Sequence, residues 1–257
     1  MAGALMSALL GVGPGKQRRP LVVLGPSGSG RSALLFRAAL VGSGVAPAPA
    51  TVMFLSPHPL ERLPCGEGDV DASVMQRIQF LYPPSFQLLF QVVANLQQTS
   101  CPTLVVLDGL EKYLSSCPGP SVAAQLVALL LDTVNHFSQK LSRMSLGCQL
   151  LVSMRFPGEA GEDTEYLSVV ERYFEARLWL HPEAVEHAGS ASHGVSKVTR
   201  ARLSQTGSQD QEWLLRFEPE GKMKISPLPC KSEKDHGAAS ENDRPTGAEA
   251  QAFPPGS

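Results

Sequence analysis

Leu21-Val-Val-Leu-Gly-Pro-Ser-Gly-Ser-Gly-Arg-Ser32 is the stretch of sequence on which the fold depends. Residues 21–24 are apolar and predict a short buried strand, and a glycine-rich turn over residues 25–30 follows directly. An amphipathic helix is predicted to begin near Ser32. This order is typical of a phosphate-binding loop, because glycine backbones turn N–H groups inward and the helix start adds more free N–H groups. The residues expected to contact the phosphates are Gly25, Pro26, Ser27, Gly28, Ser29, Gly30, Arg31 and Ser32.

One position departs from the usual pattern G-x-x-x-x-G-K-[S/T], because Arg31 stands where a lysine is expected. Arginine keeps the positive charge but carries a wider planar fork, so the exchange is not conservative in a tight site. We therefore expect nucleotide binding to tolerate Arg31 better than efficient hydrolysis does, and Arg31 is a candidate catalytic residue. Ser32 occupies the position whose hydroxyl would bind Mg2+. The alternative is a glycine-rich turn between strand and helix that binds no ligand.

The composition favours a globular protein with a substantial core. The chain has 257 residues, 43% of them hydrophobic. That is enough for one domain of about 200 residues with tails, or for two small domains. A formal net charge of −2 excludes a general attraction to nucleic acid, so such binding would need a local patch. The five cysteines show no C-x-x-C pair and no metal-ligand spacing, which predicts reduced thiols inside the cell. We expect no signal peptide and no membrane span, and a nuclear or cytosolic protein.

Strands and helices are predicted to alternate along the chain. The predicted strands cover residues 51–55, 77–82, 103–108, 148–154 and 175–180, and the predicted helices cover 32–41, a stretch capped by Ser85, 122–141 and 167–173. Alternating stretches at 197–203, 212–217 and 223–225 predict a terminal antiparallel meander. The fold class is therefore α/β, with three layers, a mainly parallel sheet and a C-terminal β-meander. We expect a flexible leader over 1–19, one domain over 20–226 and a disordered tail over 227–257.

Asp108 is the second candidate site residue, because it ends the apolar run Thr103-Leu-Val-Val-Leu-Asp108. A carboxylate at the end of a strand neighbouring the loop can hold Mg2+ through water, opposite the Ser32 hydroxyl. The alternative is an aspartate that caps the following turn. Hydrolysis also needs a group that orients the attacking water, and Glu111 and Glu61 are the candidates, although either can be a plain surface carboxylate. The polar residues at the end of the next strand, where a γ-phosphate sensor would lie, are Ser153 and Arg155.

Several short strings give the chain a resemblance to a known family. They are Ala33-Leu-Leu-Phe36, Tyr82-Pro-Pro-Ser85, Leu107-Asp-Gly-Leu-Glu111, Ala128-Leu-Leu-Leu-Asp132 and Arg172-Tyr-Phe174. Together with the phosphate loop and the terminal meander, they resemble the RecA-like recombinase ATPase core over about residues 20–226. Within that core family, the chain is most similar to the small recombinase paralogs that associate with a SWIM-domain protein in homologous recombination.

The resemblance implies a nuclear protein of DNA repair and the DNA-damage response that uses ATP and Mg2+. It implies binding to single-stranded DNA, pairing with a SWIM-domain zinc protein, and work alongside the strand-exchange recombinase and its paralogs. By the same match, residues 25–32 and Asp108 would bind the nucleotide. The chain departs from the family at Arg31 and lacks a clear catalytic glutamate after the second strand. A possible DNA-stimulated ATPase and a catalytically weak or inactive scaffold, acting only through protein contacts, therefore both stay open.

An unrelated phosphate-loop enzyme is a third hypothesis. The sequence contains no Asn-Lys-x-Asp guanine reader, which argues against a GTPase. The loop over residues 181–195 is not rich in arginine, so it does not resemble the lid of a nucleotide kinase.

DNA contacts are implied in two loops of the RecA-like core, over residues 109–120 and 155–165. The first loop contains Lys112 and Tyr113, a cation and a stacking ring, which suit single-stranded DNA. The second contains Arg155 and Phe156 but is otherwise acidic. A basic cluster on a predicted strand either contacts phosphates or forms a solvated strand face; it consists of Lys197, Arg200 and Arg202.

Phe36-Arg-Ala-Ala39 fits the Phe-x-x-Ala pattern by which recombinase subunits link. The motif lies on the helix that follows the phosphate loop. A place for Phe36 in the hydrophobic core is the competing interpretation, and it predicts that the ring is inaccessible to a partner.

Overall fold

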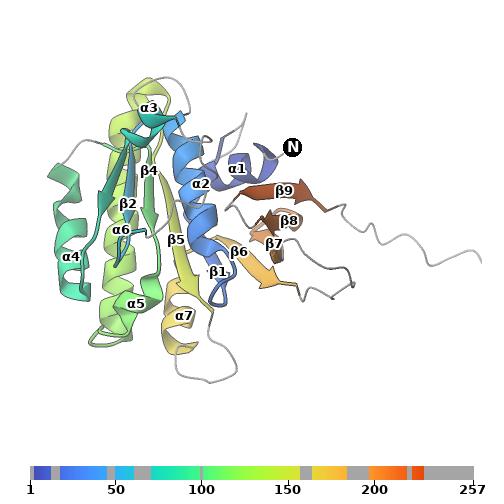
Figure 1. The fold of residues 1–257 in the computed structure, drawn as a ribbon. Helices are drawn as coiled ribbons and strands as arrows, with labels where there is room; N and C mark the ends of the chain where they lie inside the picture. Colours follow the sequence, from blue (N-terminus) through green and yellow to red (C-terminus); the bar gives the residue numbers. More distant parts are fainter. Residues whose placement is uncertain are drawn as a thin grey trace, which may run out of the picture.

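Strand β1 (Leu21–Gly25) carries the start of the phosphate loop and lies inside a broad sheet (Figure 1). The computed structural model describes residues 3–12, 18–44, 50–60, 71–98, 101–156, 164–183, 197–218 and 222–228. Within these residues the sheet has nine strands in the order β3-β2-β4-β5-β1-β6-β7-β8-β9. Its parallel part and its antiparallel C-terminal strands confirm the predicted α/β fold class with a terminal meander.

The parallel part of the sheet consists of β1, β2 (Val52–Leu55), β3 (Ile78–Leu81), β4 (Leu104–Leu107), β5 (Gln149–Arg155) and β6 (Ala176–Pro182). The antiparallel part consists of β7 (Lys197–Gln205), β8 (Gln211–Phe217) and β9 (Met223–Pro227). Strand order differs from the prediction in one respect, because β5 lies between β4 and β1. Asp108, which follows β4, is therefore one strand further from the loop than expected. Helical crossovers allow several strand orders, so the pattern of apolar runs could not distinguish them.

Successive residues of the central strands face opposite sides of the sheet and build two separate cores. Val22 and Leu24 face one core, and Leu21 and Val23 face the other. The first core is covered by α4 (Phe86–Asn95), α5 (Leu110–Leu114), α6 (Pro120–Leu141) and α7 (Thr164–Glu171). The second is covered by α1 (Gly3–Leu10), α2 (Arg31–Gly44) and α3 (Ala72–Met75). The short 3-10 helices are Leu96–Gln98 and Ser142–Met144.

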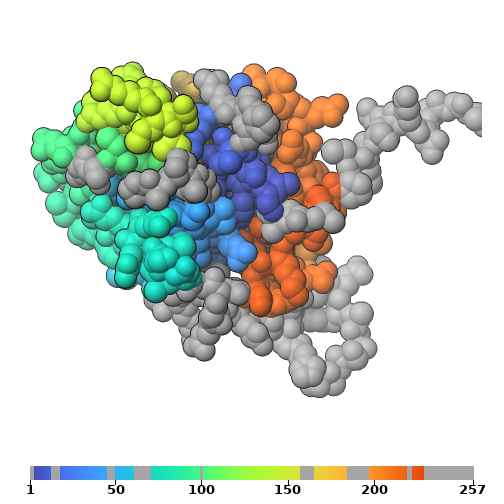
Figure 2. Space-filling view, turned by 90° about the horizontal axis from the view of Figure 1, so that it is seen from above, coloured from blue at the N-terminus to red at the C-terminus, as the bar shows by residue number. Residues whose placement is uncertain are grey.

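Helix α1 occupies part of the segment that the sequence predicted to be a flexible leader, and here the structure differs from that prediction. Leu5 and Leu9 are fully buried in the core that α2 also covers. Figure 2 shows α1 between α2 and the C-terminal strands. Packing such an apolar segment against the apolar core stabilises the folded chain, because it removes apolar surface from water. The predicted disordered tail lies almost wholly outside the described residues, since they end at residue 228.

Phe36 on α2 belongs to the second core, as the competing interpretation of the Phe-x-x-Ala motif predicted. Its side chain is fully buried. Its ring centroid lies 6.5 Å from that of Phe54 and 6.4 Å from that of Phe80. A partner could reach this ring only if α2 moved away from the sheet.

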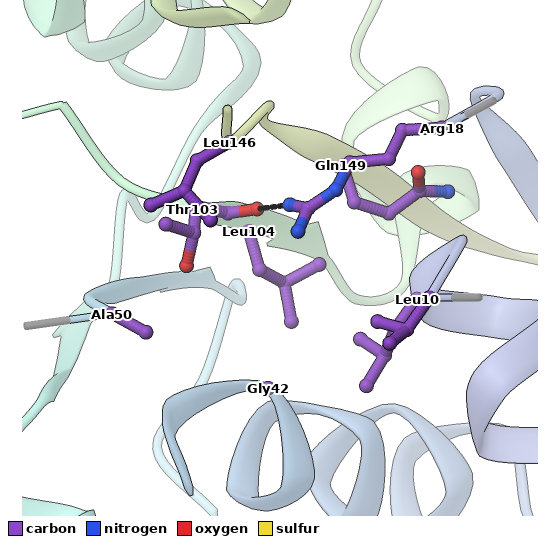
Figure 3. A pocket seen from close by; sticks show the side chains of 9 residues that line it. Leu10, Arg18, Gly42, Ala50, Thr103, Leu104, Leu146 and Gln149 are labelled. Carbon is purple, nitrogen blue, oxygen red and sulfur yellow. Dashed lines mark hydrogen bonds between the residues drawn. The ribbon is translucent and has the colours of Figure 1, made fainter. Parts of the chain in front are cut away.

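At the end of the sheet remote from the phosphate loop, the residues before β1 form hydrogen bonds with residues at the starts of β4 and β5. The Arg18 guanidinium donates to the Thr103 carbonyl at 3.0 Å and also to the Gly147 carbonyl. The Gln149 side-chain amide donates to the Arg19 carbonyl at 2.6 Å. Figure 3 shows the small pocket that Arg18 shares with Leu10, Gly42 and Leu104. Among the described helices, none has the length and apolar character needed to span a bilayer.

Candidate nucleotide-binding site

The predicted phosphate loop lies between the end of β1 and the start of α2, at the carboxyl edge of the parallel strands. Gly28 and Gly30 have φ angles of +72° and +93°, which side chains other than glycine adopt at a cost. Ser29 is 1% exposed, and its hydroxyl has no hydrogen-bond partner within the described residues. A buried hydroxyl normally finds a partner, so this atom is available to a ligand in the loop. The backbone conformation suits a bound polyphosphate.

Asp108 lies at the same edge of the sheet and is held by the strand between it and the loop. The Ser153 hydroxyl on β5 donates to Asp108 Oδ1 at 2.5 Å, and the Gly109 amide donates to that hydroxyl at 2.8 Å. Asp108 is 8% exposed. Ser153, which the sequence offered as a γ-phosphate sensor, therefore orients the carboxylate. The described residues contain no group of three or more His, Cys, Asp or Glu that could hold a metal, so Mg2+ here would rely on Ser32, Asp108 and phosphate oxygens.

Arg31 forms an ion pair with Glu111, which the sequence did not predict. Arg31 Nη2 lies 3.1 Å from Glu111 Oε1, and the two side chains are 12% and 9% exposed. Glu111 lies in the first turn of the short helix α5, which begins directly after Gly109, and from there it accepts a hydrogen bond from Arg31. Arg31 Nη1 and Glu111 Oε2 are buried and have no hydrogen-bond partner within the described chain. The pair thus depends on the one contact between Nη2 and Oε1, and Arg31 Nη1 can still donate to, and Glu111 Oε2 can still accept from, a ligand or water.

Of the two glutamates predicted to orient the attacking water, the structure describes only Glu111. Glu111 has one carboxylate oxygen on Arg31, so it can accept a proton from water only with its other oxygen or after the pair separates. Glu61 lies outside the described residues. Tyr113, on the same short helix as Glu111, was expected to stack on DNA, but it is 2% exposed and packs in the core. Burial, and then the charge of Asp108, raises the pKa of Tyr113, so the phenol stays protonated.

Two side chains of the C-terminal meander lie on the phosphate loop. Lys197 Nζ at the start of β7 donates to the Gly28 carbonyl. The Phe217 ring at the end of β8 packs against Gly30 so closely that a Cβ added there would lie 2.8 Å from Phe217 Cε2. Lys197 and Phe217 are direct cross-strand partners. The sequence placed Lys197 among DNA contacts and missed Phe217, since no local pattern reports which strand ends meet the loop.

An aromatic cluster lies beside the loop, on both sides of β1. Phe156 follows β5, is 41% exposed, and its amide donates to the Gly25 carbonyl at 3.1 Å. Its ring centroid lies 5.3 Å from that of Trp179 on β6. The Trp179 ring stacks on His181 with centroids 6.4 Å apart and an interplanar angle of 10°. Of these three residues the sequence had pointed only to Phe156, because the other two belong to a strand 20 residues further along the chain.

The structure places the remaining predicted DNA contacts on exposed surface, two of them in ion pairs. Arg200 Nη2 lies 2.9 Å from Glu183 Oε1, and Arg202 Nη2 lies 2.5 Å from Asp210 Oδ2. The hydrogen bond from Arg202 lowers the pKa of Asp210 from its ordinary value. Carboxylates beside two of the three basic side chains reduce the positive field of this strand. The other two predicted DNA contacts, Lys112 on α5 and Arg155 at the end of β5, lie outside the meander and are also exposed.

Comparisons with known proteins agree with this architecture. The chain is 41% identical over 218 residues to ATPase SWSAP1 of Homo sapiens, covering 83% of this chain and 91% of the human protein. This chain belongs to the ATPase SWSAP1 family. It is also 36% identical over 218 residues to ATPase SWSAP1 of Mus musculus, covering 84% of this chain and 76% of the mouse protein. The SWSAP1 family consists of RecA-like recombinase paralogs, so the resemblance predicted from the sequence is confirmed. The search with protein-family models finds no match.

Membership of the SWSAP1 family supports a RecA-paralog ATPase role for this chain, with nucleotide binding as its basis. The residues present fit such a ligand. The loop and Asp108 lie at the same edge of the sheet. Two loop glycines have positive φ angles, the buried Ser29 hydroxyl has no partner among the described residues, and the Asp108 carboxylate is oriented by Ser153.

Proposed function

We propose that this chain is a nuclear ATP-binding subunit of a homologous-recombination complex that repairs damaged DNA. It binds Mg2+ and ATP at residues 25–32, holds single-stranded DNA beside that site, and acts with a SWIM-domain zinc protein and the strand-exchange recombinase and its paralogs. The observation that carries the nucleotide part is the loop itself, with Gly28 and Gly30 at positive φ in front of an Asp108 carboxylate fixed by Ser153.

The residues at the site divide the work of binding. Loop N–H groups and the start of α2 bind the phosphate oxygens, and Ser32 with Asp108 holds the metal from two sides. ATP, when bound, supplies the phosphoryl group that hydrolysis transfers to water. For that reaction, Glu111 Oε2 would accept the proton of the attacking water, because Arg31 contacts the other carboxylate oxygen.

The Arg31–Glu111 pair supports the second candidate function, a scaffold that binds nucleotide without turning it over. An arginine held by a glutamate is not free to follow the γ-phosphate during transfer, and a glutamate held by an arginine has one carboxylate oxygen fewer for the attacking water. In that case the nucleotide stabilises the fold and partner contacts carry the function.

The aromatic cluster Phe156–Trp179–His181 supports DNA binding next to the nucleotide. Exposed rings at stacking distance give bases a surface, and such stacking does not depend on sequence. Arg155 precedes Phe156 and adds a cation at the same strand end. Because the Phe156 amide bonds to the Gly25 carbonyl, DNA on the cluster can influence the first residue of the loop.

A groove at the outer edge of the sheet supports a protein partner. Strand β3 pairs only with β2 within the described sheet, so its other edge presents backbone groups for pairing. The groove beside it is lined by Met53, Leu81 and Val92, and the neighbouring Leu88 is 43% exposed. The Leu88→Glu variant is expected to lose co-purification with the SWIM-domain partner, and the Phe156→Ala variant to keep it.

ATP turnover by the complex with the SWIM-domain protein, with and without single-stranded DNA, tests the main proposal. The wild type is compared with Arg31→Lys, and Asp108→Asn serves as the control that removes the metal ligand. DNA-stimulated turnover that Asp108→Asn abolishes supports a working ATPase. Turnover only in Arg31→Lys supports the scaffold. No ATP-dependent thermal shift in the wild-type complex would contradict both.

DNA binding is tested separately by fluorescence anisotropy of a labelled single-stranded oligonucleotide. Phe156→Ala is expected to weaken binding about tenfold, because base stacking contributes about 1–3 kcal/mol per base. Tyr82→Ala is the matched control, since Tyr82 is 39% exposed and stacks on Phe80 far from the loop. Equal losses in the two variants, or flat anisotropy for the wild type at low salt, would contradict the assignment.

A further inference from the structure

The phosphate loop receives a lysine from an unexpected place. Lys197 Nζ lies on the Gly28 carbonyl, although the two residues are 169 positions apart in the chain. A Cβ built on Gly28 would lie 3.0 Å from the same ammonium group, so the charge is directly against the loop backbone. This contact is made by the first residue of β7, whose place is determined by pairing with β8 on one side and β6 on the other.

A second contact from the same strand pair holds the loop at the neighbouring glycine. Phe217 is the cross-strand partner of Lys197 and packs on Gly30. The two side chains therefore approach the loop together, one at Gly28 and one at Gly30. An ordinary solvated lysine at a strand end would not share such an arrangement with a ring packed on the next glycine.

The residue at the usual lysine position points elsewhere. Arg31 Nη2 is paired with Glu111, and the pair is almost buried, so moving the guanidinium to the phosphates would leave a buried carboxylate without its cation. Two cations therefore lie at the loop. Arg31 donates to the side chain of Glu111, whereas Lys197 from β7 donates to the backbone carbonyl of Gly28.

We propose that Lys197 binds the β- and γ-phosphates of the nucleotide from within the same chain and takes the place of the lysine that Arg31 replaces. Phe217 is a positioning residue that keeps the strand end on the loop. This inference rests on the proposed nucleotide binding. An ammonium has three donors, of which the Gly28 carbonyl occupies one, and its flexible four-carbon stem lets it turn toward phosphate oxygens in the loop.

Affinity for the slowly hydrolysed analogue ATPγS, measured by calorimetry on the complex with the SWIM-domain partner, tests the proposal. Lys197→Met is expected to weaken binding about tenfold to hundredfold, since a hydrogen bond to a charged group has this effect on an equilibrium. Lys224→Met is the matched control, because Lys224 is an exposed lysine of the same meander that pairs with Glu218. The loss should be large for ATPγS and ADP and absent for adenosine, which has no phosphate.

The combination Lys197→Met with Arg31→Lys separates a phosphate contact from a structural one. A lysine returned to the loop is expected to restore the affinity lost in Lys197→Met, whereas a lysine that only supports the strand end would not be replaced in this way. Equal affinity of wild type and Lys197→Met would overturn the inference alone. Absence of ATPγS binding by the wild type would overturn the proposed function as well.

An acyl-phosphate derivative of ATP gives a direct readout. Its acyl carbon is attacked by a lysine amine near the terminal phosphate, an amide forms, and ATP leaves. Peptide mapping is expected to find the label on Lys197 and to find less of it when unmodified ATP competes. Labelling that leaves Lys197 unmodified and marks only other lysines would overturn the inference.

Discussion

The parallel and antiparallel parts of the sheet contribute different things to the phosphate loop. The parallel part supplies the loop backbone and Asp108, all at strand ends that share one edge. The antiparallel part supplies the side chains of Lys197 and Phe217, and Lys197 lies 169 positions after Gly28, which it contacts. The comparison shows that the shape of the loop is a local property, while the charges and rings around it come from distant segments.

The cationic side chains of the two parts of the sheet also differ in burial and in their partners. In the parallel part Arg31 is almost buried and paired with Glu111. In the antiparallel part Arg200 and Arg202 form exposed ion pairs, and Lys197 alone of the three predicted basic residues contacts the loop. Changes in the parallel part should therefore affect the stability of the fold most, and changes in the exposed pairs least.

Phe36→Ala is expected to have the largest effect. Removing a fully buried phenyl ring from the core costs about 3–5 kcal/mol in free energy of unfolding. Urea denaturation measures this loss, and Leu88→Ala, at a site 43% exposed, is the control with an effect below about 1 kcal/mol. A stable Phe36→Ala variant that only lost contact with another recombinase subunit would instead favour the linking interpretation of the motif.

Gly30→Ala is expected to break the junction between the two parts. Its φ of +93° disfavours a side chain, and the added Cβ would overlap the Phe217 ring, so the combined cost is roughly 2–4 kcal/mol. Phe217→Leu in the same chain should recover part of the lost unfolding free energy in a double-mutant cycle. Strictly additive losses would mean that Phe217 does not press on Gly30.

Glu111→Gln is expected to have an intermediate effect. It leaves the nearly buried Arg31 charge without its carboxylate, which costs about 1–2 kcal/mol of unfolding free energy. The loss should be smaller when the same substitution is made in an Arg31→Gln background, because the charge is then gone. Chemical denaturation of the wild type, the two single variants and the double variant measures the coupling between the two residues, and zero coupling would contradict the ion pair.

The pair Arg202–Asp210 is expected to give the smallest effect on stability, and this effect depends on pH. The hydrogen bond from Arg202 lowers the pKa of Asp210, so this carboxyl binds its proton more readily in the unfolded chain than in the folded one. Its contribution to stability is fully present above the unfolded pKa of about 4 and is lost as the pH falls through the lower folded value. Thermal unfolding of wild type and Asp210→Asn should therefore differ at pH 7 and converge near pH 2. A difference that grew toward low pH would contradict a lowered pKa of Asp210 in the folded chain.

The strand, loop and helix around residues 21–32 could be predicted from the residues alone, as could the apolar strands, the Ser85 helix cap and the terminal meander, because all of these depend on periodicity and short-range hydrogen bonds. Three features became visible only in the folded chain: β5 separates Asp108 from the loop, Glu111 pairs with Arg31, and residues 3–10 pack into the core. The contacts of Lys197 and Phe217 with the loop are of the same kind. These contacts join segments far apart in the chain, and their free energy depends on strand order and helix packing, which no local pattern of residues specifies.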